Sequence, residues 1–200
     1  MWQWTLNWGQ ITPRLVIGSC PMQPEHLARI QRETGISAMF SLQHDACHAY
    51  WRIDYPELVR VAAEHGVEMH RCPIRDMDIA DMQRHLAQAV SALARLQEQG
   101  HRTYVHCTAG MGRAPLVVLG YLSLVVGLGP EEAIRLILTG RPEAVPAWEA
   151  YHGCIEDLTG QHREQIERRA YDLYREGAWG SAKKDWYVAQ AEVLRGVLQA

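Results

Sequence analysis

Short apolar runs alternate with longer amphipathic segments along the first half of the chain. The runs are bounded by Gly, Pro or charged residues, which is typical of buried strands. They span residues 15–19, 37–42, 68–74 and 103–107. The segments between them place apolar residues three and four positions apart, which predicts helices at 24–33, 55–65 and 82–99. Strands that alternate with helices predict an α/β fold with a central, mainly parallel sheet flanked by helices.

The second half of the chain has a helical pattern throughout. The helices predicted first span residues 113–128, 130–138 and 147–158. We expect them to cover one face of the sheet. From Thr159 the chain becomes polar, and two further helices are predicted at 163–176 and 184–198. These patterns predict one domain over residues 1–158 and a helical C-terminal module over residues 159–200.

Composition restricts the partners of the chain. Its 200 residues are 48% apolar and 22% charged, as in an ordinary globular domain. The net charge of −3 provides no general positive field for nucleic acid or for an anionic membrane surface. The uncharged run at 114–130 is shorter than the roughly 20 residues of a spanning helix, so we expect a buried helix there.

The N-terminus and the cysteines indicate the compartment. The first ten residues show no basic segment followed by an apolar one, so no signal peptide is expected. Five cysteines without a regular framework favour free thiols in a reducing, cytoplasmic environment. The cluster of His44, Asp45, Cys47 and His48 lacks the paired spacings of a structural zinc site. We expect a loop at this cluster, and neither a metal nor a cofactor.

One segment carries the candidate chemistry. Residues 105–115 read VHCTAGMGRAP and lie where a predicted strand ends and a helix begins. Glycines in such a loop let successive backbone N–H groups face one point, and the positive end of the following helix supports an anion there. The sequence therefore predicts a phosphate cradle. Its expected members are Thr108, Ala109, Gly110, Met111, Gly112 and Arg113.

Two side chains at the ends of this loop suit phosphoryl transfer. Arg113 can donate paired hydrogen bonds to two phosphate oxygens. The positive field favours the thiolate of Cys107, which can attack the phosphorus of a bound phosphate in line. The sequence therefore predicts a cysteinyl-phosphate intermediate. His106 is expected to be a buried residue that shapes the loop.

The leaving oxygen needs a proton, and three aspartates are candidates for the general acid. Asp76, Asp78 and Asp81 follow the strand that ends near residue 74, at the edge of a parallel sheet where Cys107 is also expected. Asp81 precedes a helix expected to begin near Met82 and is interpreted as its N-cap. Asp76 is the preferred acid.

These motifs resemble a known family. The pattern HC-x5-R is similar to that of the cysteine-dependent dual-specificity phosphatases, and the resemblance covers about residues 8–158. IGSC, SLQHD, PIRDMD and HCTAGMGRAP resemble the plant and algal glucan phosphatases, which remove phosphate monoesters from starch. The resemblance implies that Cys107 is the nucleophile, Arg113 binds phosphate and Asp76 is the acid. Ala114 replaces the Ser or Thr of most dual-specificity enzymes, as it does in the glucan branch.

The glucan branch lines its cleft with aromatic residues that stack on sugar rings. Trp8, Tyr50 and Trp51 stand at positions where such aromatics are expected, whereas Met77 and Val145 replace two others. The resemblance therefore implies a reduced sugar-binding surface that includes Trp8, Tyr50, Trp51 and Met77. No carbohydrate-binding module, which some starch-acting relatives have, is recognised in the chain.

Phosphorylated glucan is the preferred substrate, and several alternatives stay open. A phosphoprotein phosphatase is the first, and a catalytically silent phosphate-binding adaptor and a sulfurtransferase belong to other classes. A phosphoinositide substrate is disfavoured because residues 108–112 contain no Lys or Arg. The C-terminal helices resemble a module appended to bacterial proteins and could contact a partner. Cys20 or Cys72 could form a protective disulfide with Cys107.

Overall fold

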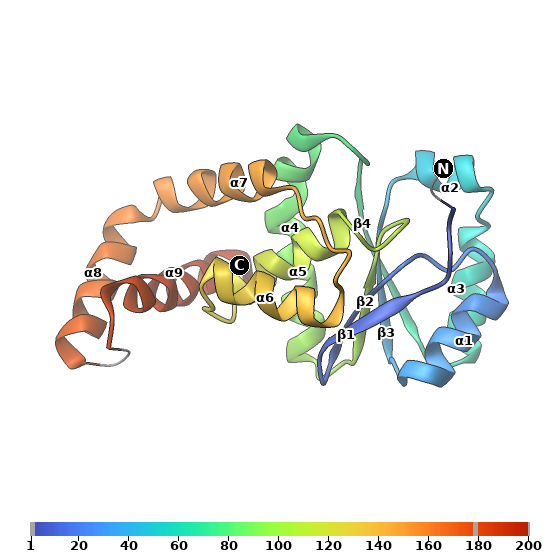
Figure 1. Ribbon diagram of the computed structural model, residues 1–200, viewed down its shortest axis with the longest axis horizontal. Helices are drawn as coiled ribbons and strands as arrows, with labels where there is room; N and C mark the ends of the chain where they lie inside the picture. Colours follow the sequence, from blue (N-terminus) through green and yellow to red (C-terminus); the bar gives the residue numbers. More distant parts are fainter. Residues whose placement is uncertain (1–2, 178–179, 200) are drawn as a thin grey trace.

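The computed structural model describes residues 3–177 and 180–199 around a five-stranded sheet (Figure 1). In the order of the sheet, the strands are β1 (Trp8–Thr12), β2 (Leu15–Gly18), β5 (Thr103–His106), β3 (Ala38–Gln43) and β4 (Glu68–Ile74). Neighbouring strands from β2 to β4 are parallel, and β1 is antiparallel to β2. The predicted mainly parallel sheet is confirmed, so the carboxyl ends of β2, β5, β3 and β4 meet at one edge.

Helices cover both faces of this sheet (Figure 1). They are α1 (Pro24–Thr34), α2 (Asp45–Trp51), α3 (Tyr55–Glu64), α4 (Ile79–Glu98), α5 (Arg113–Leu124), α6 (Pro130–Gly140), α7 (Trp148–Gly160), α8 (Arg163–Glu176) and α9 (Ala182–Gln199). Because side chains alternate along a strand, neighbours point to opposite faces. On β5, Tyr104 joins the cluster of α1 and α3, whereas Val105 joins that of α4 and α5.

The structure differs from the sequence analysis at three places, where one strand was missed and two predictions are wrong. β1 was not predicted, because a five-residue strand with a mixed burial pattern gives little signal before it pairs with β2. The cluster near His44 is not a loop but the start of α2, which His44 caps by accepting the backbone N–H of Ala46. Helix α4 begins at Ile79 rather than near Met82, and Asp78 is its N-cap.

The C-terminal helices pack partly on themselves and partly on the body of the molecule. α8 and α9 lie side by side and share a small cluster around Ile166, Leu173 and Ala189. The end of α9 packs against α4 and α5, where Leu194 and Leu198 join the main core. Positions 178 and 179, in the predicted connection between the two helices, lie outside the described residues. Within the described parts of the chain, every helix is too short or too polar to cross a membrane.

Candidate active site

The carbonyl oxygens of the loop between β5 and α5 point outward and accept hydrogen bonds from surrounding residues. Cys107 follows β5 and is 3% exposed, and Arg113 begins α5. The carbonyl oxygens of residues 108–112 accept N–H groups of Cys20, Arg141, Val145 and the first turn of α5. Because a trans peptide points its N–H opposite to its C=O, the amides of this segment face the inside of the loop. Together with the N-terminus of α5, these amides give the loop the geometry of an anion-binding cradle.

Gly110 lets this loop pack directly on the sheet. Its φ of +71° lies in the left-handed region, which costs other residues about 1–2 kcal/mol. A Cβ atom at this position would lie 2.4 Å from the carbonyl oxygen of Gly18 at the end of β2. A side chain at position 110 would therefore push the loop away from the sheet.

Arg141, which follows α6, holds the loop from behind and was missed by the sequence analysis. It is 5% exposed, its Nη2 donates to the carbonyl oxygen of Ala109 at 2.8 Å, and its Nε donates to that of Gly110 at 3.3 Å. An arginine at the end of a helix gives no sequence signal for this role, because only the packing of α6 on β1 brings it under the loop. Arg141 thus positions the amides of the cradle.

Replacing Arg141 with Gln is expected to raise the KM for an aryl phosphate about tenfold or more while thermal stability changes less. Each lost charge-assisted hydrogen bond is worth roughly 1.5–3 kcal/mol, and both lost bonds orient the cradle. Steady-state kinetics and orthovanadate inhibition measure this effect, and Arg141→Lys should restore part of it. The exposed Arg135 of α6 supplies the control Arg135→Gln. Equal vanadate affinity in Arg141→Gln and the parent protein would contradict a positioning role.

The guanidinium of Arg113 is fully buried and ties the loop to two strand ends. Its Nη1 donates to the carbonyl oxygens of Ile74 at 2.8 Å and Leu42 at 3.4 Å. Its Nη2 donates to Thr108 Oγ1 at 3.3 Å and pairs with Asp76 Oδ2 at 2.9 Å. Its buried Nε has no hydrogen-bond partner among the described residues. One donor of this group is thus left for a ligand.

Burial and neighbouring charges decide which groups of the site are charged at neutral pH. Arg113 is charged, whereas Cys20 and His106 are neutral. Burial disfavours the charged guanidinium of Arg113, but the neighbouring Cys107 and Asp76 raise its pKa above the ordinary value. Burial, and then Cys107, raise the pKa of Cys20 to about 12, so this neighbour stays a thiol at neutral pH. Burial lowers the pKa of His106 to about 3, and its Nδ1 lies 3.2 Å from the carbonyl oxygen of Cys107. The neutral imidazole therefore donates to the backbone.

The acid loop after β4 is anchored at both ends around Asp76. The backbone N–H of Arg75 donates to Asp81 Oδ2 at 2.7 Å, and Asp78 Oδ1 accepts the N–H of Asp81 at 2.9 Å. The prediction that Asp81 caps α4 is wrong, because the helix starts earlier and Asp81 instead holds the loop. Between these anchors, the side chain of Asp76 is 50% exposed and reaches Arg113.

The predicted sugar-binding residues lie at different depths. Trp8 is half-buried, packs edge-on against Tyr104 and is covered by the guanidinium of Arg29. Tyr50 is 78% exposed on α2 and meets the ring of Trp51 edge-on at 5.2 Å. Met77, at the tip of the acid loop, is 89% exposed.

The far rim of the loop carries an exposed aromatic that the sequence analysis missed. The N–H of Val145 donates to the carbonyl oxygen of Met111 at 2.7 Å, which places the segment before α7 beside the loop. Trp148, three residues further on, is 38% exposed. Its position next to Val145, where the resemblance implies an aromatic, could have drawn attention to it.

Two cysteines other than Cys107 contact the loop or Arg113, and a third lies on β4. Cys20 donates its N–H to the carbonyl oxygen of Thr108, and Cys47 of α2 accepts a hydrogen bond from Arg113 Nη1 at 3.5 Å. Cys72 lies on β4, and β3 separates it from β5. Two strand spacings are about 9.5 Å, more than the roughly 7 Å between Cα atoms that a disulfide can span. The interpretation of Cys72 as a disulfide partner of Cys107 therefore fails.

Comparisons with known proteins show what this chain is similar to. The family model of the dual specificity phosphatase catalytic domain matches residues 21–156. Phosphoglucan phosphatase DSP4, amyloplastic, of Castanea sativa is 34% identical over 164 residues, which cover 80% of this chain and 43% of that protein. Laforin of Mus musculus is 31% identical over 147 residues, which cover 68% of this chain and 44% of laforin. The chain thus spans less than half the length of these two relatives.

Solved structures show the same fold. A crystal structure of PTPMT1 is similar with a TM-score of 0.59 and 21% identity, covering 78% of this chain and 99% of that one. The kinase associated phosphatase, solved with its catalytic-site cysteine replaced by serine, has a TM-score of 0.59 and 20% identity, covering 78% of this chain and 94% of that one. At these identities, the likeness concerns the fold alone.

Proposed function

Because the chain belongs to the dual specificity phosphatase family, we propose that it hydrolyses phosphate monoesters through a cysteinyl-phosphate intermediate and that its substrate is a phosphorylated glucan. The environment of Arg113 is the observation that supports the proposed hydrolysis. Its buried guanidinium lies beside both Cys107 and Asp76, and its Nε lacks a partner among the described residues. A phosphate oxygen would satisfy this donor, whose desolvation is otherwise costly.

The residues of the site divide the reaction into two displacements. Cys107 Sγ attacks phosphorus, the S–P bond forms, and the P–O bond to the alcohol breaks while Asp76 gives its proton to the leaving oxygen. A water molecule then attacks phosphorus and gives its proton to Asp76, and the S–P bond breaks to release phosphate and the thiolate. Arg113 and the loop amides stabilise the charge on the phosphoryl oxygens in both steps.

The ion pair of Asp76 with Arg113 couples the acid to the substrate. A phosphate dianion competes with the carboxylate for Nη2 of Arg113, which now pairs with Asp76 at 2.9 Å. Phosphate binding would therefore free the carboxyl group of Asp76 from the guanidinium, so that it can turn toward the leaving oxygen.

The glucan part of the proposal is supported by the relatives and by the rim of the site. A phosphoglucan phosphatase and laforin are among the proteins that this chain resembles. Tyr50 projects from α2, whose preceding strand β3 ends at the same sheet edge as β5. The faces of an exposed tyrosine ring are apolar and can stack on a sugar ring, while its hydroxyl can form a hydrogen bond. We propose that Tyr50 and Trp51 contact the glucan.

The test is phosphate release from phosphorylated amylopectin, a phosphotyrosine peptide and a small aryl phosphate, with Cys107→Ser protein as the blank. The proposal expects a glucan-to-aryl ratio clearly above that of a protein phosphatase measured in parallel. Tyr50→Ala should lower kcat/KM on the glucan on the order of tenfold, because about 1.5–3 kcal/mol accompanies burial of a large side chain. The aryl phosphate should be hydrolysed as before.

A matched control for Tyr50 is Tyr171→Ala, because Tyr171 is 61% exposed on α8. Unchanged glucan turnover in this variant, together with a loss in Tyr50→Ala, supports the proposed contact. A loss only in Tyr171→Ala would move the glucan contact to the C-terminal helices. Equal glucan-to-aryl ratios for the parent and Tyr50→Ala proteins would count against glucan contact by Tyr50.

A phosphoprotein substrate is the second candidate, and two exposed residues favour it. Met77 is 89% exposed beside the acid and Val145 is 68% exposed beside the loop, at positions where the glucan branch is expected to carry aromatics. Hydrolysis of the peptide and aryl phosphate without the glucan would select this function. Binding without turnover would select the adaptor, and thiocyanate formation from cyanide without phosphate release would select the sulfurtransferase.

A further inference from the structure

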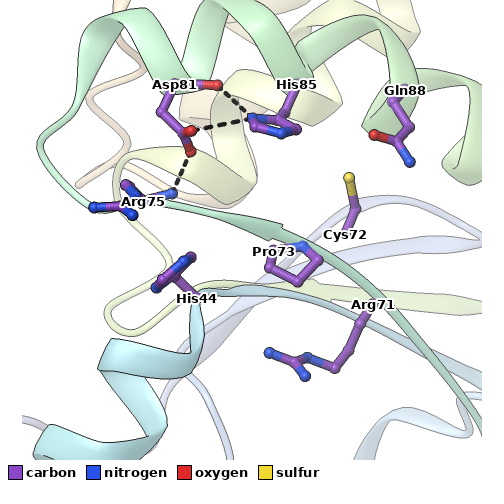
Figure 2. A pocket seen from close by; sticks show the side chains of 8 residues that line it. All are labelled: His44, Arg71, Cys72, Pro73, Arg75, Asp81, His85 and Gln88. Atoms are coloured by element: carbon purple, nitrogen blue, oxygen red, sulfur yellow. Dashed lines mark hydrogen bonds and ion pairs between the residues drawn. The ribbon is translucent and has the colours of Figure 1, made fainter.

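A pocket of about 430 Å³ lies along β4, an edge strand of the sheet, beside the acid loop, whose anchoring residues Arg75 and Asp81 line it. Its volume is within the range of small-molecule sites. Side chains from the start of α2, from β4 and from α4 line it, with Cys72, His85 and Gln88 on one side of the β4 ribbon and Arg71 on the other (Figure 2). They are His44, Arg71, Cys72, Pro73, Arg75, Asp81, His85 and Gln88. We call this pocket the β4 groove.

The positive charge of Arg75 is available in the β4 groove. Arg75 is exposed, and its guanidinium has no hydrogen bond or ion pair with the residues that the structure describes. The carboxylate of Asp81 is already satisfied, because Oδ2 accepts the backbone N–H of Arg75 and Oδ1 lies 3.4 Å from His85 Nδ1. The groove therefore presents an unpaired cation next to a satisfied carboxylate.

Two imidazoles add one donor and one acceptor to the β4 groove. His44 Nδ1 accepts the N–H of Ala46 at 3.2 Å, so the neutral ring carries its proton on Nε2. His85 Nδ1 donates to the carbonyl oxygen of Asp81 at 2.9 Å, so the Nε2 of the neutral ring is an acceptor that suits a sugar hydroxyl. Gln88 lies one turn further along α4 and adds an amide (Figure 2).

The β4 groove and the catalytic loop share the same strand ends. The backbone oxygen of Gln43 accepts a hydrogen bond from Arg71 at 3.0 Å, and the side-chain amide of Gln43 donates to Thr108 at 3.3 Å. The carbonyl oxygen of Ile74 holds Arg113, and the next residue, Arg75, lines the groove. A long substrate that reaches Cys107 could thus extend along the edge of β4.

We propose that the β4 groove binds a phosphate monoester other than the one that Cys107 attacks. The unpaired guanidinium of Arg75 and the Nε2–H of His44 suit the negative charge and the oxygen acceptors of this group, while Nε2 of His85 can accept a sugar hydroxyl. The phosphate comes from one of two sources, a second phosphate on the same glucan chain or a free sugar phosphate. The first source rests on the proposed glucan function, and the second does not.

The binding test uses full-length Cys107→Ser protein and glucose 6-phosphate, with backbone amide shifts followed by NMR. The proposal expects two binding curves, one reported by Gly110 and one by His85 and Gln88. Adding Arg75→Gln should weaken the second about tenfold and leave the first unchanged. His85→Gln provides an independent variant, and Arg84→Gln, an exposed charge on α4 outside the groove, is the matched control. The proposal is overturned if His85 and Gln88 do not shift, or if Arg75→Gln and Arg84→Gln bind alike.

Kinetics on malto-oligosaccharides with one or two phosphates distinguish the sources. A higher kcat/KM on the doubly phosphorylated chain that is lost in Arg75→Gln identifies a second phosphate of the substrate. Groove binding of glucose 6-phosphate without this preference identifies a free sugar phosphate. If the parent protein hydrolyses neither oligosaccharide, the glucan proposal fails, while the NMR result still decides whether the β4 groove binds a phosphate.

Discussion

Replacing Cys107 with Ser is expected to lower phosphate release from every substrate by about four orders of magnitude or more. A hydroxyl is a far weaker nucleophile than a thiolate. Phosphate binding should persist, because the loop amides and Arg113 are unchanged. Steady-state turnover of an aryl phosphate and binding of inorganic phosphate to the same protein measure the two effects.

Cys154→Ser is the matched control for Cys107. Cys154 is an equally buried thiol on α7, a helix that packs against α4. This variant should keep its turnover even if its melting temperature falls. A Cys107→Ser protein that retained turnover would refute the nucleophile and revive a non-covalent or adaptor function.

Asp76→Asn is expected to lower kcat on an alkyl phosphate by roughly 10²–10⁴-fold and kcat on a p-nitrophenyl phosphate much less. An amide cannot give a proton to the leaving oxygen, and a nitrophenolate leaves without one. The variant also loses the ion pair with Arg113, but that carboxylate is half exposed, so the effect on stability should be small. The ratio of kcat values on the two substrates is the informative quantity.

Asp78→Asn is the control for Asp76, because Asn caps a helix as well as Asp does. Its side chain can still accept the N–H of Asp81, so α4 and the acid loop should keep their positions. We expect little change in the ratio of the two kcat values. A leaving-group effect in Asp78→Asn and none in Asp76→Asn would transfer the acid role to Asp78.

Sequence patterns succeeded where a structural feature is local. The four parallel strands were each predicted close to their observed bounds, because a short run bounded by Gly, Pro or charged residues needs no partner to be recognised. The position of residues 107–113 between a strand and a helix also followed from neighbouring residues. Strand β1 escaped prediction because its signal is its pairing with β2, which no local window contains.

The acid loop shows why helix starts are harder to predict. Asp78 and Asp81 both precede apolar residues of α4, and each is a favourable N-cap by residue type. Their roles separate only in three dimensions, where Asp78 caps the helix and Asp81 accepts the N–H of Arg75. The sequence offers two equivalent N-cap residues, and the path of the chain after β4 decides which of them caps the helix.

The sequence by itself determined the α/β order and the residues of the candidate cradle, because both are written in residue type and spacing within one short segment. Only the tertiary structure decided which distant groups complete the site. Arg141 reaches the loop from α6, the carbonyl oxygens of Leu42 and Ile74 hold Arg113, and three separate segments enclose the β4 groove. These contacts depend on the order of the strands in the sheet, which brings together the ends of elements that are far apart in the chain.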